Sequence, residues 1–284
     1  MTQSVLSNHL KIKTMINSYS DSFTKAELKV ANVVNERTEE ILYFSVTELA
    51  EAASVADATV LRFCRKIRFK GYQDFKLALA QDLSAQKQFN VEETGADDYI
   101  SHFFQNIHYT IEECKNLITK EVLDEAIAII SEAKSLYFFG VGTSGITALD
   151  AKSRLMRIGK RADAISDPHF QSMLAATLTE KDVVIGLSVS GSTKDIIDSL
   201  TFAKNNGAKI IAITNYAKSP ITKIADLVLL TSGKELPLEG GSIFAKMSQL
   251  FIIDLICIGL GIQDEEKTKR MKEKTAKAVI NKIL

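Results

Sequence analysis

The chain has few residues of the kinds that mark several large classes of protein. Its three cysteines, Cys64, Cys114 and Cys257, are too few and too far apart for a disulfide framework or a metal cluster. Basic and acidic residues both number 35, so no net charge holds the whole chain to a polyanion. Internal repeats and low-complexity tracts are also missing. These absences favour a globular protein of the reducing cytoplasm, with no metal and no cofactor.

Long apolar runs are missing as well. The first ten residues do not combine a basic start with an apolar run, so we expect no secretory signal. The longest apolar stretch, Leu250 to Leu260, contains Asp254 and is too short to span a bilayer, so we expect no membrane anchor. With 46% hydrophobic residues over 284 positions, the chain can bury a substantial core, and its length suggests two domains.

Hydrophobic periodicity divides the chain into two parts. Residues 23–83 contain no proline and keep helical spacing almost throughout, and Thr24 and Glu27 have the spacing of a capping box. Residues 84–98 are polar and lose this periodicity, as an inter-domain connection does. We therefore predict an all-α domain at residues 1–83, a linker at 84–98 and a second domain at 99–284.

Short β-branched or aromatic segments alternate with helical ones in the second domain, after a helical pattern from residue 99 to 131. The predicted strands are Leu136–Phe139, Ala162–Ile165, Val183–Leu187, Ile210–Thr214 and Leu227–Leu230. Apolar strands separated by helices indicate a parallel sheet covered on both faces, hence a three-layer α/β fold. A last helix, at about 242–259, is apolar nearly all round and should be buried against the sheet or a second subunit.

Two short helices with a tight turn between them are predicted within residues 45–70. The apolar face of the first is formed by Val46, Leu49, Ala50 and Ala53. The second should begin near Asp57, which we expect as its N-cap, and should bury Val60, Leu61, Cys64 and Ile67. About four residues join the two helices, which is typical of a helix-turn-helix.

Basic residues are concentrated on the second of these helices. Five lie between Arg62 and Lys70, with no acidic residue among them. We expect Thr59, Arg62 and Lys66 to share the face opposite the core, with Arg65 beside it, and to reach DNA base edges, while Lys70 meets phosphates. The alternative is a solvated basic face on an ordinary helix. The core is predicted to include Phe63, Phe69 and Tyr72.

Residues 23–83 resemble the helix-turn-helix domain of RpiR-type bacterial regulators. The resemblance is carried by three segments: Ala58–Val60, Arg62–Lys66 and Phe69–Lys76. Ser54, in the turn, and Arg68, after the second helix, stand where that family commonly has glycine. Because glycine adopts a left-handed backbone at little cost, we expect either strain or slightly altered turns at these two positions.

Two segments rich in glycine and hydroxyl groups follow predicted strands and lead directly into helices: Gly140–Gly145 and Ser188–Thr193. Hydroxyls and free amides at a helix N-terminus bind anions, so both segments suit a phosphate. The first segment differs from the dinucleotide motif GxGxxG, and no acidic residue ends the second strand. For the second segment, the alternative is a plain capping box formed by Ser192 and Asp195.

Both segments resemble the sugar isomerase (SIS) domain of phosphosugar isomerases and of RpiR-type regulators, over about residues 120–262. The resemblance implies phosphosugar contacts from the first and second segments: Gly142, Thr143, Ser144, Ser188, Ser190, Ser192 and Thr193. His169, after the second strand, either donates to the ligand or caps the next helix.

The interpretation that unites these features is a regulator of carbohydrate metabolism with no enzymatic activity. It would bind a palindromic operator in double-stranded DNA as a homodimer or homotetramer and sense a sugar phosphate, with amino-sugar 6-phosphates among the candidates. The alternative is a phosphosugar isomerase or lyase with an accessory helical domain, using Glu239 and His169, although Glu239 also fits a solvated loop. A scaffold that binds phosphosugars without DNA is disfavoured by the basic face.

Overall fold

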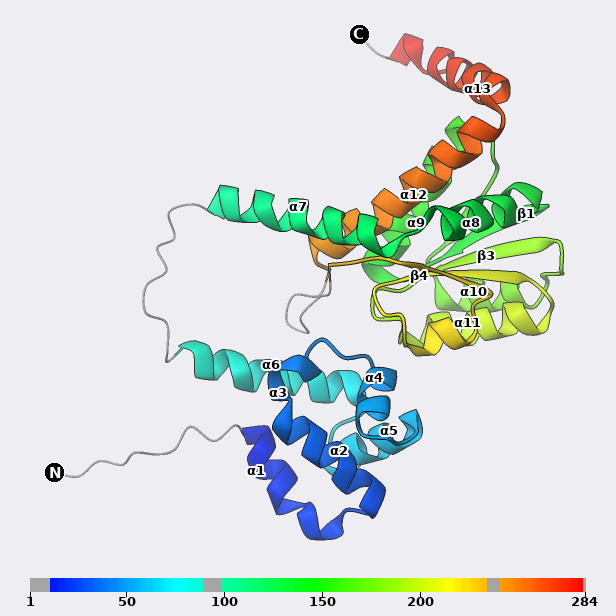
Figure 1. Ribbon diagram of the computed structural model, residues 1–284. Coiled ribbons are helices and arrows are strands. Elements are labelled where there is room, and N and C mark those ends of the chain that lie inside the picture. The colour runs from blue at the N-terminus through cyan, green and yellow to red at the C-terminus, as the bar shows by residue number, and fades with distance from the viewer. Residues whose placement is uncertain (1–10, 89–98, 234–240, 283–284) are drawn as a thin grey trace. The chain divides into compact units, whose positions relative to one another are not determined.

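The computed structural model describes residues 11–88, 99–233 and 241–282. Contacts within the chain separate two units that divide near His102 (Figure 1). Helix α6 (Tyr72–Gln88) continues into the predicted linker, because the residues from Ala85 to Gln88 are good helix formers despite their lack of an apolar stripe. The rest of that linker, residues 89–98, lies outside the described residues.

The first unit consists of helices around one apolar core. They are α1 (Lys11–Ser18), η1 (Ser20–Ser22), α2 (Lys25–Glu36), α3 (Thr38–Ile41), α4 (Val46–Ala52), α5 (Asp57–Lys66) and α6. The predicted capping box begins α2: Thr24 Oγ1 accepts from the Glu27 amide at 3.3 Å, and the Glu27 carboxylate accepts from the Thr24 amide at 2.8 Å. Ser45 and Glu48 form a second box, which begins α4.

Helices α4 and α5 form the predicted pair, with two differences in detail. Asp57 is the first residue of α5 and not its N-cap, which is Ala56. The Asp57 carboxylate instead accepts a hydrogen bond from Thr47 Oγ1 on α4 at 3.0 Å and so ties the two helices together. Leu61, expected in the core, is only half-buried. The other core residues expected in this segment, Val60, Cys64 and Ile67, are fully buried. Phe63 and Tyr72 are buried with them, as predicted.

Both α4 and α5 end in a left-handed residue that is not glycine. Ser54 has φ 52° and Arg68 has φ 71°. Each turn contains both backbone hydrogen bonds of a Schellman motif. In the first turn, for example, the Val55 amide donates to the Ala50 carbonyl at 2.8 Å. Elsewhere, α9 and α11 end in the same motif at Gly159 and Gly207. The turns after α4 and α5 therefore have the ordinary Schellman geometry, and the strain lies in the left-handed backbone of Ser54 and Arg68.

We expect Ser54→Gly to stabilise the first unit. The left-handed conformation costs roughly 1–2 kcal/mol for a residue with a Cβ, and the greater flexibility of unfolded glycine offsets part of the gain. The net increase in the free energy of unfolding should be about 0.5–1 kcal/mol. Hydrogen exchange of the α4 and α5 amides measures it, with Ser20→Gly as a control at an ordinary backbone position. Faster exchange in Ser54→Gly would contradict the account.

The second unit is built on a five-stranded parallel sheet in the order β2-β1-β3-β4-β5. Three of these strands, β1, β3 and β4, are labelled in Figure 1. The strands are β1 (Ser135–Phe139), β2 (Asp163–Ile165), β3 (Asp182–Leu187), β4 (Lys209–Thr214) and β5 (Leu227–Leu230). Each of the five predicted strands is present, with bounds shifted by at most one residue. The sequence reveals β1, β3 and β4 because they are largely buried runs rich in β-branched or aromatic residues, whereas β2 is short and partly exposed.

Helices cover both faces of this sheet, which confirms the three-layer α/β prediction. On one face α8 (Lys120–Glu132), α9 (Gly142–Arg157) and α12 (Ile243–Gln263) pack against Val183, Ile185 and Leu187. On the other, α10 (Pro168–Ala175) and α11 (Lys194–Asn205) pack against Val184. The remaining elements are α7 (Tyr99–Leu117), η3 (Pro220–Lys223), α13 (Glu265–Lys277) and η4 (Ile280–Lys282).

Helix α12 is longer than the apolar stretch seen in the sequence. It has 21 residues and, by length and composition alone, could cross a membrane. One side of it is buried against α8 and α9, through residues such as Ile252 and Ile256, while Ile258 and Ile262 are exposed. Its apolar character is therefore explained in part by packing within the second unit.

Candidate functional site

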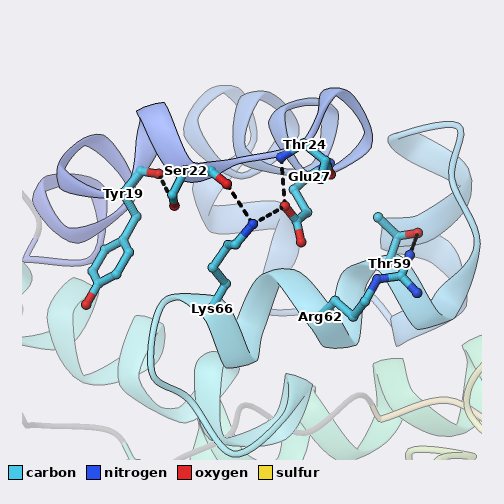
Figure 2. A network of polar contacts seen from close by, with 7 residues as sticks. All are labelled: Tyr19, Ser22, Thr24, Glu27, Thr59, Arg62 and Lys66. Atoms are coloured by element: carbon cyan, nitrogen blue, oxygen red, sulfur yellow. Dashed lines mark hydrogen bonds and ion pairs between the residues drawn. The ribbon is translucent and has the colours of Figure 1, made fainter.

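The exposed face of α5 differs from the predicted one by one residue at its start. Arg62, Arg65 and Lys70 are exposed, as expected. Thr59 is only 5% exposed, and its Oγ1 accepts a hydrogen bond from Arg62 Nη2 at 2.9 Å (Figure 2). The expectation that Thr59 lies on the face opposite the core is therefore wrong. The exposed residue in this first turn is Ala58, which sequence reasoning passed over because it carries no polar group.

Lys66 is half-buried, also contrary to the expectation of an exposed face. Its ammonium donates to Glu27 Oε2 on α2 and to the Ser22 carbonyl, both at 2.7 Å (Figure 2). No sequence pattern reveals this contact, because Lys66 and Glu27 are 39 positions apart. The ammonium is thus engaged within the unit, whereas Arg65 beside it projects from the surface.

The first glycine-rich segment turns sharply from β1 into α9. A Cβ on Gly140 would lie 2.6 Å from the Ser144 carbonyl oxygen, and Gly142 has φ 57°, so the backbone path requires glycine at the first of these and favours it at the second. Thr143 is half-buried, and Ser144 is buried, where its hydroxyl accepts from Gln249 Nε2 of α12 at 3.4 Å. Gln249, fully buried and remote in sequence, is a residue that the sequence analysis missed.

The second segment is a tight turn held by its own hydroxyls. Ser188 and Thr193 pair through their hydroxyl oxygens at 3.0 Å. Ser190 Oγ accepts from the Ser192 amide at 3.2 Å, and Ser192 Oγ donates to the Ser190 carbonyl at 3.2 Å. Helix α11 therefore begins after Thr193, and the alternative capping box of Ser192 with Asp195 does not form.

Residues at the end of β4 and after it hold this turn in place. The Thr214 hydroxyl donates to the Val189 carbonyl at 3.2 Å, and the Asn215 amide donates to the same oxygen at 3.1 Å. Gly191, with φ 60°, lies so close to Ser219 that a Cβ would approach the Ser219 hydroxyl to 2.2 Å. The turn is therefore fixed before any ligand arrives, which lowers the entropic cost of binding.

The two segments lie beside each other at the carboxyl edge of the sheet. They follow β1 and β3, which are paired neighbours, and the helices after them run on opposite faces. In a sheet of this order, that point is where open α/β folds bind ligands. Among the α-helices of the second unit whose preceding residue is described, only α9 and α11 lack a side-chain cap. Both N-termini thus keep amide donors that suit an anion.

Of the two candidate acid-base residues, only His169 lies within the described part of the chain. His169 is exposed at the start of α10 and does not cap that helix, since Asp167 accepts from the Phe170 amide at 2.9 Å. Glu239 lies outside the described residues. Within the described ranges, no three His, Cys, Asp or Glu side chains cluster as metal ligands would.

Two family models match the chain. Residues 10–86 match a helix-turn-helix domain of the rpiR family, and residues 129–259 match a SIS domain. An uncharacterized HTH-type transcriptional regulator from Haemophilus influenzae is 37% identical, over 93% of this chain and 95% of its own. The HTH-type transcriptional regulator HexR of Pseudomonas aeruginosa is 31% identical, over 91% of this chain and 93% of its own.

Solved structures agree with these matches. The NanR protein of Vibrio vulnificus, complexed with ManNAc-6P, has a TM-score of 0.87 at 28% identity, and the match covers 96% of this chain and all of that one. The sugar isomerase domain of an RpiR transcription factor from Sphaerobacter thermophilus has a TM-score of 0.59 at 21% identity over 64% of this chain, which supports the fold alone. Both parts of the chain therefore have counterparts in a single class of protein.

Proposed function

Since the chain belongs to the RpiR family of helix-turn-helix transcription regulators that carry a SIS domain, we propose that its SIS domain binds a sugar phosphate between the segments Gly140–Gly145 and Ser188–Thr193. Binding there changes the affinity of the first unit for its operator. The observation that carries this proposal is the pair of hydroxyl-lined turns at neighbouring strand ends, each leading into a helix without a side-chain cap.

The phosphate occupies the second turn. Ser190, Ser192 and Thr193 supply hydroxyls, and the first amides of α11 supply N–H donors and the positive end of the helix dipole. The other members of the site are Gly142, Thr143, Ser144, His169 and Ser188. His169 donates to the phosphate or to a sugar hydroxyl from the neighbouring strand end. NanR, the structural relative, binds an N-acetylamino-sugar 6-phosphate, so such compounds lead the candidates.

DNA binding uses the exposed face of α5. Arg62 reads a base edge in the major groove, and Arg65 and Lys70 meet base edges and phosphates. The protein binds a palindromic operator in the cytoplasm as a homodimer or homotetramer, because two copies of α5 must reach two half-sites. Two further residues of α5 hold this face in position. Thr59 is buried and accepts a hydrogen bond from Arg62, and Lys66 is bound to Glu27.

We also propose that the chain is not an enzyme. Its curated relatives include proteins named as transcriptional regulators over more than nine-tenths of both chains. Isomerisation needs a base at the sugar carbons, and the imidazole of His169 is exposed with no carboxylate bound to it among the described residues. Turnover of a bound sugar phosphate, followed by NMR, would contradict this part of the proposal.

Thermal denaturation against a panel of sugar phosphates tests the ligand site. A ligand that binds the folded state at about 100 times its Kd should raise the melting temperature by about 5 °C. The panel contains hexose, amino-sugar and pentose phosphates, with the unphosphorylated sugars as controls. A shift with one phosphorylated sugar supports the proposal. No shift with any of them would leave the SIS unit without its proposed ligand.

Gly191→Ala should abolish that shift. A Cβ at this position would collide with the buried Ser219 hydroxyl at 2.2 Å, and φ 60° is unfavourable for alanine, so the turn must distort. Gly261→Ala is the matched control, because its Cβ would meet only Thr268 at an ordinary 3.5 Å. The control should keep the full shift. A normal ligand response in Gly191→Ala would remove the phosphate from this turn.

A further inference from the structure

Lys66 connects three elements of the first unit through a single ammonium group. Its Nζ donates to the Ser22 carbonyl at the end of η1 and to Glu27 Oε2 in the first turn of α2, both at 2.7 Å. The same carboxylate oxygen accepts from the Thr24 amide, which closes the capping box of α2 (Figure 2). The last turn of α5 is thereby joined to the start of α2.

The carboxylate in this network has little access to water. The side chain of Glu27 is 6% exposed, and that of Lys66 is 31% exposed. Burial alone would raise the pKa of Glu27, but the hydrogen bonds from Lys66 and Thr24 outweigh it and lower the pKa below its ordinary value. Glu27 is therefore ionised at neutral pH, and a cation must remain beside it, because a buried unpaired carboxylate is costly.

A Lys66 that moved to a DNA phosphate would leave this carboxylate without its cation. The ammonium has three donors, and two of them are already bound within the protein. Arg65, one position earlier, is exposed and available to a phosphate. Two adjacent basic residues of α5 thus have different surroundings, and the difference predicts different roles.

We propose that Lys66 is a positioning residue that fixes α5 against α2 through Glu27 and Ser22, so that Arg62 and Arg65 are aimed at the DNA, and that it makes no phosphate contact of its own. This inference rests on the DNA binding of the first unit. It also predicts that Glu27 affects operator affinity, although its side chain is buried and cannot contact DNA directly.

The test compares how the affinity of each variant depends on salt. An operator duplex is first selected from a random-sequence pool with the wild-type protein and then labelled for fluorescence anisotropy. The affinity falls as salt rises, and removal of one phosphate contact reduces the magnitude of the slope of log K against log salt by about 0.9. Lys66→Met should bind about 10-fold or more weakly with an unchanged slope, because only the docking of α5 is lost. Arg65→Met, the matched control, should lose about one unit of slope.

Glu27→Gln separates the two roles by the sign of its effect. Glutamine can still close the capping box but does not attract the ammonium. If Lys66 positions α5, Glu27→Gln weakens operator binding as Lys66→Met does, again at constant slope. If Lys66 is a phosphate contact, Glu27→Gln frees it, and both the affinity and the slope rise. The second result, or a smaller slope in Lys66→Met, would overturn the inference.

Hydrogen exchange provides a readout in the absence of DNA. The α5 amides should exchange faster in Lys66→Met and Glu27→Gln, should keep wild-type rates in Arg65→Met, and should recover in Lys66→Arg, which can restore the ion pair. Unchanged exchange in Lys66→Met would contradict a positioning role. If the wild-type protein selected no duplex, the proposed function itself would fail. An altered slope in Lys66→Met or Glu27→Gln, together with normal wild-type binding, would contradict only this inference.

Discussion

Arg62→Ala should weaken binding to the selected operator by about 10- to 100-fold, the range expected for the loss of a bidentate contact to a base. Arg62 is exposed in the middle of α5, and its guanidinium is held in place by the hydrogen bond from Nη2 to Thr59 Oγ1. The affinity of the second unit for its sugar phosphate should not change, because the substitution lies in the other unit. Operator titration and calorimetry of ligand binding measure the two effects separately.

Arg62→Lys is the matched control for charge. Lysine keeps the positive charge but lacks the planar fork that reads guanine, so specific binding should remain weak while binding to random DNA recovers. Equal loss of operator and ligand affinity in Arg62→Ala would mean that the two units do not act as separate binding modules. Full operator binding by Arg62→Lys would show that Arg62 contacts a phosphate and not a base.

Ser190→Ala combined with Thr193→Ala should weaken sugar phosphate binding by about 100-fold or more, because each removed hydroxyl is a hydrogen bond to a charged group. Operator binding without the ligand should be unchanged, so the variant should no longer respond to the effector. Both hydroxyls lie in the turn before α11, and neither is needed to cap that helix. Isothermal titration with the ligand identified by the thermal panel provides the measurement.

Thr201→Ala is the control for this double substitution. Its hydroxyl donates to the Ile197 carbonyl within α11 at 2.7 Å, on an exposed part of the same helix. It should bind the ligand normally, which would exclude a general effect of lost hydroxyls. A full ligand response in the double variant would place the phosphate elsewhere in the second unit.

The parts of the fold that were predictable are those set by local sequence. Most of the strands are recognisable as short apolar runs between helical segments, as in Val183–Leu187. The short β2 is marked chiefly by its place between two helical segments. The α4–α5 pair is recognisable because its apolar residues recur at helical spacing. The left-handed Ser54 and Arg68 could be anticipated from the glycines that usually occupy such turns.

The errors in the candidate site arise where tertiary contacts decide. The predicted DNA-facing side of α5, with Thr59, Arg62 and Lys66, lies at the edge of the side that is exposed in the structure. Helical spacing alone does not fix how a helix is rotated about its axis to within one residue. The partner of Lys66 is on another helix, and the partner of Ser144 is Gln249, 105 positions away. Contacts over such separations leave no periodic signal in a single sequence.

The central claim is that a sugar phosphate bound by the second unit controls the DNA affinity of the first. A ligand can do this only if it binds the DNA-competent and DNA-incompetent states with different affinity. The direct measurement is anisotropy of the selected operator duplex, titrated with wild-type protein in the presence of each sugar phosphate of the panel. We predict that one compound changes the operator affinity by about 5-fold or more, in the range of typical allosteric coupling. An operator affinity that stays constant with a sugar phosphate that demonstrably binds would contradict the account.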